Sequence, residues 1–143
     1  MTEPASDIAY IALGSNIGDR NAHLARARAA IAMIPKTRII GESTAEETTP
    51  IGPVEQGPFL NQMVAVETSL APHDLLAALQ SIEAREGRVR DERWGPRTLD
   101  LDIVRFERQT IDEPSLRVPH PELPNRDFWR RELDELGADS GEV

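Results

Sequence analysis

The sequence predicts an α+β protein whose elements follow the order β-α-β-β-α-β. Four short runs are apolar and rich in β-branched residues, which is typical of strands. Two longer segments repeat their apolar residues with the period of a helix. Glycine, proline and polar residues separate these segments, so each has a recognisable beginning and end.

Length and composition indicate one domain. The chain has 143 residues, of which 39% are hydrophobic, and this is enough for a single core. We expect the domain to span residues 1–143, with frayed tails at 1–6 and 137–143. The formal net charge of −9 argues against nucleic acid as a partner.

Several classes of protein are excluded by what the sequence lacks. It contains no cysteine, so neither a disulfide framework nor a zinc–thiolate site can form. Its first residues, M-T-E-P-A-S-D, are polar and acidic, and no apolar run reaches membrane-spanning length. We therefore expect a cytoplasmic protein, most simply a monomer, that does not bind a membrane.

The first third of the chain predicts a strand, a helix and a second strand. The apolar run I-A-Y-I-A-L indicates a strand at 8–13, and it leads into G-S-N-I-G-D at 14–19. This glycine spacing is neither of the two common phosphate-binding patterns, so a tight turn is the simpler interpretation. Asp19 is suited to cap a helix over about 20–34, which ends before a proline. A strand over 37–43 follows.

Residues 45–58 form a long connection with three prolines and two glycines. Such a segment is either a binding loop or a disordered surface loop, and the sequence favours neither. The strand expected at 59–68 places Phe59 and Asn61 on one face. An aromatic ring can stack on a flat heterocycle while an amide pairs with its edge, although asparagine at a strand start is also a common turn residue.

The second helix begins near Pro72 and ends at Gly87, a favourable residue just past a helix end. Gln80 and Glu83 are three residues apart and therefore share a face of this helix. Without other information, the simplest interpretation is that both side chains face solvent.

Residues 87–106 carry most of the chemistry. The first half is polar, and five of the 16 basic residues lie at 85–97. The second half alternates with a strand period, which places Asp100 and Asp102 on one face and apolar residues on the other. Two carboxylates at this spacing are about 6–7 Å apart at their Cα atoms and can converge on one cation or a close pair. The loop supplies phosphate-binding guanidinium groups and one indole: Arg88, Arg90, Arg93, Arg97 and Trp94.

This combination predicts a site for a nucleotide and magnesium. The alternative is a solvated strand face with Asp–Arg pairs, which would be the better interpretation of two aspartates alone. The arginines and the tryptophan just upstream favour the site.

The C-terminal part predicts a short strand at 110–111 and a last helix from Asn125 to about Leu136. His120 lies between two prolines, so its backbone is rigid and its ring can donate to phosphate. Arg126 can serve phosphate as well, and Phe128 can stack on a flat ring opposite the aromatic residue at position 59.

Motifs in nearly every segment resemble one family, the 6-hydroxymethyl-7,8-dihydropterin pyrophosphokinases. The shared motifs span about residues 8–128 and read G-S-N, T-T-P-I-G, F-L-N, R-D-E-R-W-G-P-R-T-L-D-L-D-I, V-P-H-P and N-R-D-F. The resemblance implies a three-layer α-β-α sandwich around a ferredoxin-like core. It also implies transfer of the terminal diphosphate of ATP, as co-substrate, to the hydroxymethyl group of a reduced pterin in folate biosynthesis.

The resemblance also implies residue roles. Two Mg²⁺ ions would be held by Asp100 and Asp102, and Arg88 and Arg97 would join these carboxylates in catalysis. The pterin would contact Thr49, Ile51, Phe59, Asn61, Trp94 and Phe128. ATP would contact Gln80, Glu83, Arg88, Arg90, Trp94, Arg97, Ile103, His120 and Arg126.

Two other functions stay open at this point. After Phe128 the family usually continues with apolar residues and a proline, whereas this chain continues W-R-R-E. That polar end favours a relative that binds nucleotide and pterin without turnover. Paired aspartates with arginines would also suit a metal-dependent phosphohydrolase, although aromatic and amide side chains beside the site favour a flat heterocyclic acceptor over water.

Overall fold

The computed structural model describes residues 5–49, 56–87 and 98–138. Its elements are β1 (Asp7–Ser15), α1 (Arg20–Ala32), β2 (Thr37–Glu42), β3 (Glu46–Thr48), β4 (Phe59–Thr68), α2 (Pro72–Arg85), β5 (Asp100–Phe106), β6 (Ile111–Glu113), β7 (Leu116–Val118), the short 3-10 helix η1 (Leu123–Asn125) and α3 (Asp127–Glu135). Within these ranges no helix is both long enough and apolar enough to cross a bilayer.

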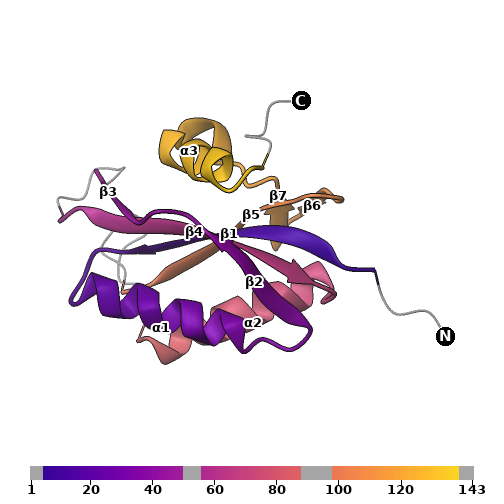
Figure 1. The fold of residues 1–143 in the computed structure, drawn as a ribbon, viewed down its shortest axis with the longest axis horizontal. Helices are drawn as coiled ribbons and strands as arrows, with labels where there is room; N and C mark the ends of the chain where they lie inside the picture. The colour runs from indigo at the N-terminus through magenta and orange to yellow at the C-terminus, as the bar shows by residue number, and fades with distance from the viewer. Residues whose placement is uncertain (1–4, 50–55, 88–97, 139–143) are drawn as a thin grey trace.

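One antiparallel sheet forms the middle of the molecule. Its strands lie in the order β2-β4-β1-β5, and β3 also pairs with β4 (Figure 1). The chain therefore passes from β1 through α1 to an edge strand, and from β4 through α2 to the opposite edge. This is the predicted α+β class with the ferredoxin-like β-α-β-β-α-β core.

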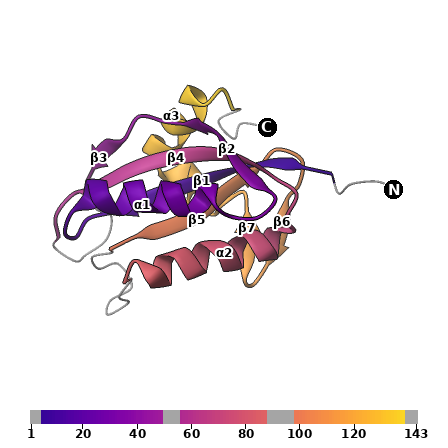
Figure 2. The same cartoon turned by 60° about the horizontal axis from the view of Figure 1, so that its bottom comes forward.

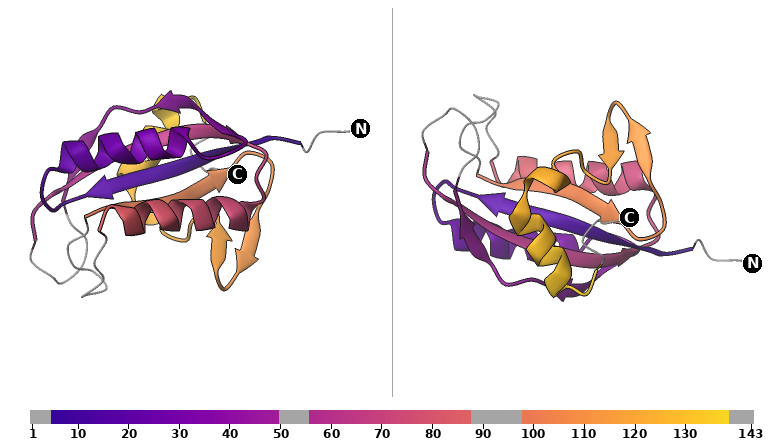
Figure 3. Two further views of the ribbon diagram at one scale, coloured as in Figure 1. Left: turned by 90° about the horizontal axis from the view of Figure 1, so that it is seen from below. Right: turned by 90° about the horizontal axis from the view of Figure 1, so that it is seen from above.

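Helices cover both faces of the sheet, so the predicted three layers are present. Helices α1 and α2 lie side by side on one face (Figure 2), and α3 crosses the other (Figure 3, right). The larger apolar cluster lies under α1 and α2, and a smaller one, which includes Trp129 and Leu133, lies under α3. Because both faces are covered, the central strands β1 and β4 are buried over almost their whole length.

The helix boundaries follow from the predicted local signals. The side chain of Asp19 accepts a hydrogen bond of 3.0 Å from the backbone N–H of Ala22, so it caps α1 as expected. Pro72 occupies the first turn of α2, where its missing N–H costs nothing. Gly87 follows that helix with φ +80°, a conformation that glycine adopts without strain.

Two short pairings were not predicted. Strand β3 lies inside the segment treated as one long connection, because Glu46–Thr48 pair with Phe59–Asn61 of β4. The short strand expected at 110–111 is one arm of a hairpin, in which β6 pairs with β7. The last helix begins two residues later than expected, since η1 precedes it. Hydrogen bonds from the N–H groups of Gly137 and Ala138 then close its end.

Candidate active site

Three side-chain positions line up across the sheet at one end of the central strands. Gly14 of β1 is opposite Asn61 of β4 on one side and opposite Asp100 of β5 on the other. Residues directly opposite one another in an antiparallel pair project to the same face. The predicted pterin residue and the first predicted metal ligand therefore face the same side of the sheet, separated by a position without a side chain.

The next row across the sheet identifies which face this is. Ala12 is opposite Met63 on β4 and opposite Asp102 on β5. Ala12 and Met63 belong to the apolar cluster under α3. Asp102 therefore faces the α3 side, and so does Asp100 two residues earlier. Both carboxylates are half-buried at the rim of this layer.

The glycine in the first row leaves room for its neighbour. A Cβ atom at Gly14 would lie 3.1 Å from Oδ1 of Asn61 and 3.5 Å from Cδ1 of Phe59. The amide of Asn61 thus reaches across the central strand toward β5. The sequence indicates a turn and a family motif at G-S-N, but the role of its glycine depends on strand register, which a single sequence does not reveal.

Strand β3 fixes the orientation of that amide. Nδ2 of Asn61 donates a hydrogen bond to Oγ1 of Thr48, which pairs with Phe59 in the sheet. The Asn61 side chain is 7% exposed, so this bond is made away from bulk water. Thr49, which the resemblance implies as a pterin contact, is exposed. The threonine that contacts Asn61 is its neighbour Thr48.

The aromatic residues of the predicted pterin site come from two elements. Phe59 begins β4 and Phe128 lies in the first turn of α3, and both rings are half-buried. The Phe128 ring contacts Trp129, with ring centroids 6.2 Å apart. Phe59 and Phe128 are both described, and no ring contact joins them.

His120 lies beside the second carboxylate. Its Nε2 is 3.7 Å from Oδ1 of Asp102, and its backbone N–H donates to the carbonyl oxygen of Val104 on β5 at 2.8 Å. The backbone N–H of Glu122 donates to Nδ1 of the ring at 3.1 Å. A nitrogen that accepts a hydrogen bond carries no proton, so the neutral ring has its proton on Nε2, on the side of Asp102.

The two aspartates fit magnesium by the chemistry of their donor atoms. Mg²⁺ prefers oxygen ligands and is commonly held by one or two carboxylates, with phosphates and water completing its shell. Within the described ranges, no group of three or more histidine, cysteine, aspartate or glutamate residues could hold a metal ion alone. A metal on Asp100 and Asp102 would take its remaining ligands from outside this pair, and water and phosphate oxygens are both suited to that role.

The predicted ATP residues on α2 and β5 have different surroundings. Glu83 is 7% exposed, and its Oε2 accepts a hydrogen bond of 2.7 Å from the backbone N–H of Leu101. Gln80 is exposed. The side chain of Ile103 is 3% exposed in the cluster under α1 and α2, so only its backbone can reach a ligand. These three residues belong to the α2 side, and the two aspartates belong to the α3 side.

Five of the predicted site residues lie outside the described part of the chain. They are Ile51, Arg88, Arg90, Trp94 and Arg97.

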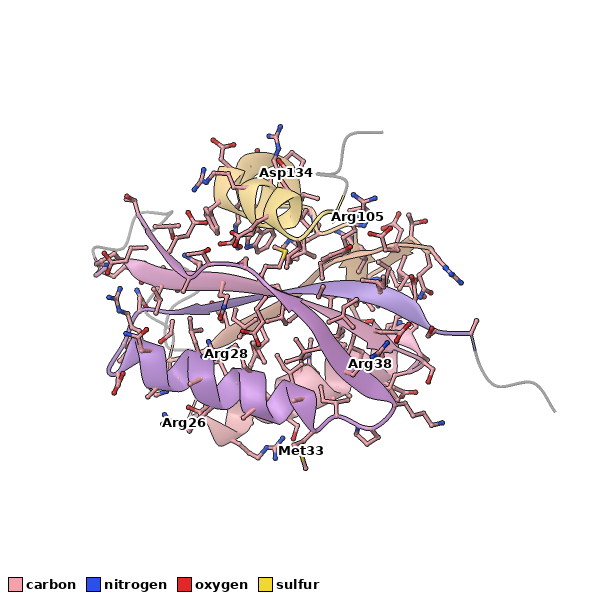
Figure 4. All side chains as sticks on the ribbon, in the orientation of Figure 1. Arg26, Arg28, Met33, Arg38, Arg105 and Asp134 are labelled. Atoms are coloured by element: carbon pink, nitrogen blue, oxygen red, sulfur yellow. The ribbon has the colours of Figure 1, made fainter. Side chains whose placement is uncertain are left out.

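Several other arginines serve the fold. Figure 4 shows Arg28 between α1 and the sheet, whereas Arg26 and Met33 point away from it. Arg28 donates a hydrogen bond to Gln62, Arg26 to Glu86 and Arg38 to Glu67, each at 2.7–2.9 Å. Arg126 differs, because its guanidinium group lies over the ring of Trp129.

Taken together, these observations define an α+β domain with a ferredoxin-like core and, at one end of its sheet, paired carboxylates beside an amide and aromatic rings. The chain belongs to the 7,8-dihydro-6-hydroxymethylpterin-pyrophosphokinase (HPPK) family, whose model matches residues 10–138. The resemblance read from the motifs is thereby confirmed.

Individual relatives agree with this assignment. The chain is 46% identical over 130 residues to a 2-amino-4-hydroxy-6-hydroxymethyldihydropteridine pyrophosphokinase of Pseudomonas aeruginosa, covering 91% of this chain and 80% of the relative. A Bacillus subtilis protein of the same name is 46% identical over 131 residues, covering 92% and 78%.

The fold is also similar to that of a solved structure, Plasmodium falciparum HPPK-DHPS wild type with pteroate. The TM-score is 0.69 and the match covers 94% of this chain, but only 39% of the Plasmodium chain. At 16% identity this likeness concerns the fold alone.

Proposed function

We propose that this protein transfers the pyrophosphoryl group of ATP to the hydroxymethyl group of 6-hydroxymethyl-7,8-dihydropterin, leaving AMP, as a step of folate biosynthesis. Family membership supports the activity. The structural observation that carries it is the row across the sheet in which Asn61, Gly14 and Asp100 stand opposite one another. This row places an amide suited to a heterocycle and a carboxylate suited to a metal on either side of a glycine.

The pterin side of the site is built on β4 and α3. The amide of Asn61 pairs with the polar edge of the pterin, and its orientation is already fixed by Thr48. Phe59 and Phe128 contribute ring faces from two sides, while Thr49 and Ile51 belong to the adjoining connection. A site built on buried hydrogen bonds rejects ligands that leave its groups unpaired, which makes the site selective for the pterin edge.

The phosphate side is built on β5, on the segment before it and on the start of α3. Asp100 and Asp102 would hold two Mg²⁺ ions, which when bound would neutralise phosphate charge and orient the β-phosphorus. His120 directs its Nε2 proton into the same region, and Arg126 adds a permanent positive charge. ATP contacts are completed by Gln80, Glu83, Arg88, Arg90, Trp94, Arg97 and the backbone of Ile103.

The reaction needs positioning and charge compensation. The hydroxymethyl oxygen forms a bond to the β-phosphorus, the bond from that phosphorus to the α,β-bridging oxygen breaks, and AMP leaves with the electron pair. The hydroxyl proton passes to solvent late in the step. Arg88, Arg97 and the Nε2–H of His120 stabilise the negative charge that develops on the phosphate oxygens.

We propose that the protein acts as a monomer in the cytoplasm, where ATP is available as co-substrate. Gel filtration with light scattering tests the first part, since a dimer would elute at twice the mass of 15.9 kDa.

The polar C-terminal segment gives no support to a relative without turnover. It forms α3, whose Trp129 and Leu133 are buried against the sheet. Incubation with ATP, Mg²⁺ and the pterin, followed by quantification of AMP, tests the activity against both alternatives. AMP that appears only with the pterin supports the transferase. A phosphohydrolase would release AMP or ADP without the pterin, and a binding module would release neither.

A further inference from the structure

We propose that Trp129 is a positioning residue for nucleotide binding, which holds Arg126 and His120 toward the phosphates and leaves the charge of Arg126 uncompensated. The inference rests on the proposed function, because it assigns these two side chains a role toward ATP. It concerns the stretch W-R-R-E at residues 129–132 of α3.

Trp129 is one of the best-fixed side chains in the molecule. It is 2% exposed and belongs to the apolar cluster between α3 and the sheet, together with Met63, Val104 and Leu133. A large ring packed on all sides keeps one rotamer, so it restricts the conformations of the side chains that contact it.

Arg126 rests on this ring. Its Cζ atom is 4.4 Å from the centroid of the Trp129 ring, the geometry of a cation–π contact. Its Nε is buried and has no hydrogen-bond partner among the residues that the structure describes. The nearest carboxylate along the helix, Asp127, is paired with Arg130 at 3.8 Å.

The cation–π contact with Trp129 differs from an ion pair in its effect on the charge of Arg126. Arg131, on the same helix, is held by the carboxylate of Glu46 at 2.8 Å, and that pair has no net charge. Arg126 forms no ion pair with a carboxylate in the ranges that the structure describes. An aromatic face attracts a guanidinium through its quadrupole but carries no negative charge. As far as the described residues are concerned, the charge of Arg126 therefore stays available to a phosphate.

The same ring also contacts His120. The centroids of the His120 and Trp129 rings are 4.9 Å apart at an interplanar angle of 83°, an edge-to-face contact. The hydrogen bond that Glu122 donates to Nδ1 fixes the remaining freedom of the ring. Together these contacts aim Nε2 at Asp102.

Variants of Trp129 test this role. Trp129→Leu keeps an apolar side chain but removes the aromatic face, and Trp129→Phe keeps a smaller face. Leu133→Ala is the matched control, because Leu133 is fully buried one turn later on the same side of α3 and belongs to the same cluster. Calorimetry with the full chain measures the Kd of α,β-methylene-ATP with Mg²⁺ and, separately, the Kd of the pterin. Circular dichroism and urea unfolding monitor the fold.

We expect Trp129→Leu to weaken nucleotide binding about tenfold and pterin binding less than about twofold. Trp129→Phe should recover most of the nucleotide affinity. Leu133→Ala should lower stability and change neither Kd by more than about twofold. In an Arg126→Ala background, Trp129→Leu should have a smaller effect on nucleotide Kd, because part of its role acts through the arginine.

Two results would overturn the proposal: a Trp129→Leu protein that binds the nucleotide as the wild type does, or a Leu133→Ala protein with the same loss as Trp129→Leu. If Trp129→Leu does not fold, the wild-type protein still gives an answer. The δ protons of Arg126 should be shifted upfield by the indole ring current in its NMR spectrum, and unshifted signals would contradict the contact. Failure of the proposed function is a different result, namely wild-type protein that binds no nucleotide.

Discussion

Nε2 of His120 stands 3.7 Å from Oδ1 of Asp102, at the point where the segment after β7 returns to β5. Nδ1 of the same ring accepts a hydrogen bond from the backbone N–H of Glu122. The histidine therefore presents a proton, not a lone pair, to the side of the sheet that carries the carboxylates. The Nε2–H of His120 is a donor and the carboxylate of Asp102 is an acceptor, and the two lie side by side. Such a pair suits a ligand that has both anionic oxygens and bound cations.

The paired carboxylates give the first prediction. Asp102→Asn and Asp100→Asn should each reduce turnover about a hundredfold or more at saturating ATP, because each removes a ligand charge for Mg²⁺. Both side chains are half-buried, so the midpoint of urea unfolding should change little. Turnover is measured as AMP released per minute over a series of Mg²⁺ concentrations.

Asp112→Asn is the matched control, since Asp112 is exposed on the hairpin, where it pairs with Arg117 at 3.5 Å. It should keep wild-type turnover. Near-wild-type turnover of Asp102→Asn at high Mg²⁺ would show that the paired-carboxylate interpretation is wrong.

The second prediction concerns the amide in the row across the sheet. Asn61→Ala should weaken pterin binding by about 1–3 kcal/mol and nucleotide binding much less, because it leaves a buried partner unpaired. Calorimetry with each ligand separates the two effects. Gln62→Ala is the control: Gln62 is equally buried but faces the other side of the sheet, where it binds Arg28. Equal losses for both ligands in Asn61→Ala would rule out an amide that recognises the pterin.

The third prediction concerns the hydrogen bond that holds β5 to α2. Glu83→Ala leaves the buried N–H of Leu101 without this acceptor, which should destabilise the protein by about 1–3 kcal/mol. Leu101 lies between the two predicted metal ligands, so turnover should fall as well. Glu83→Gln keeps a hydrogen-bond acceptor, so its stability and its turnover should lie between those of the wild type and those of Glu83→Ala. Ser81→Ala, an exposed change on the same helix, should alter neither quantity, and a Glu83→Ala protein as stable as Ser81→Ala would refute the prediction.

The fourth prediction is a pH dependence of stability. Glu132 of α3 is 1% exposed, and burial, with the Glu46 carboxylate nearby, raises its pKa to about 9. Glu135 acts in the same direction and Arg131 in the opposite one. The folded state therefore keeps a proton that the unfolded chain loses above pH about 4.5.

Because the folded state binds this extra proton, the stability of the protein should fall as pH rises. Protonated Glu132 contributes its full stability below pH about 4.5, and the contribution is lost as pH rises toward 9, at about 1.4 kcal/mol per pH unit. Glu132→Gln should remove this slope, whereas Glu135→Gln, an exposed change on the same helix, should keep it. Urea unfolding at pH 6, 7 and 8 measures it, and parallel curves for wild type and Glu132→Gln would contradict the assignment.

The long elements could be predicted because their signals are local. Strand β4 has the predicted limits of 59 and 68, and the cap of α1 and the glycine after α2 are where the sequence indicated. Strand β3 could not be predicted, since E-E-T has no strand signature and is ordered only by pairing with β4. The hairpin of β6 and β7 is equally short and depends on the same kind of pairing.

The kinds of residue that form the site could be predicted from the sequence, but how these residues lie relative to one another could not. The alternation in β5 placed both aspartates on one face, as the structure has them. The role of Gly14 depends on strand register, and the burial of Glu83 depends on how α2 lies under β5, so neither follows from the sequence alone. Trp129 is predicted only as part of the last helix, because its contact with His120 depends on how the segment after β7 returns to α3, and its contact with Arg126 depends on the turn at the start of that helix.

Transfer of an intact diphosphate from ATP to the pterin can be followed by phosphorus-31 NMR of a reaction with ATP, Mg²⁺ and 6-hydroxymethyl-7,8-dihydropterin, with Asp102→Asn run beside the wild type. We predict one AMP signal and two coupled signals of a diphosphate ester in equal amounts, all dependent on the pterin, and almost none with the variant. Orthophosphate, free pyrophosphate or ADP as the main product, or products that form without the pterin, would contradict the account.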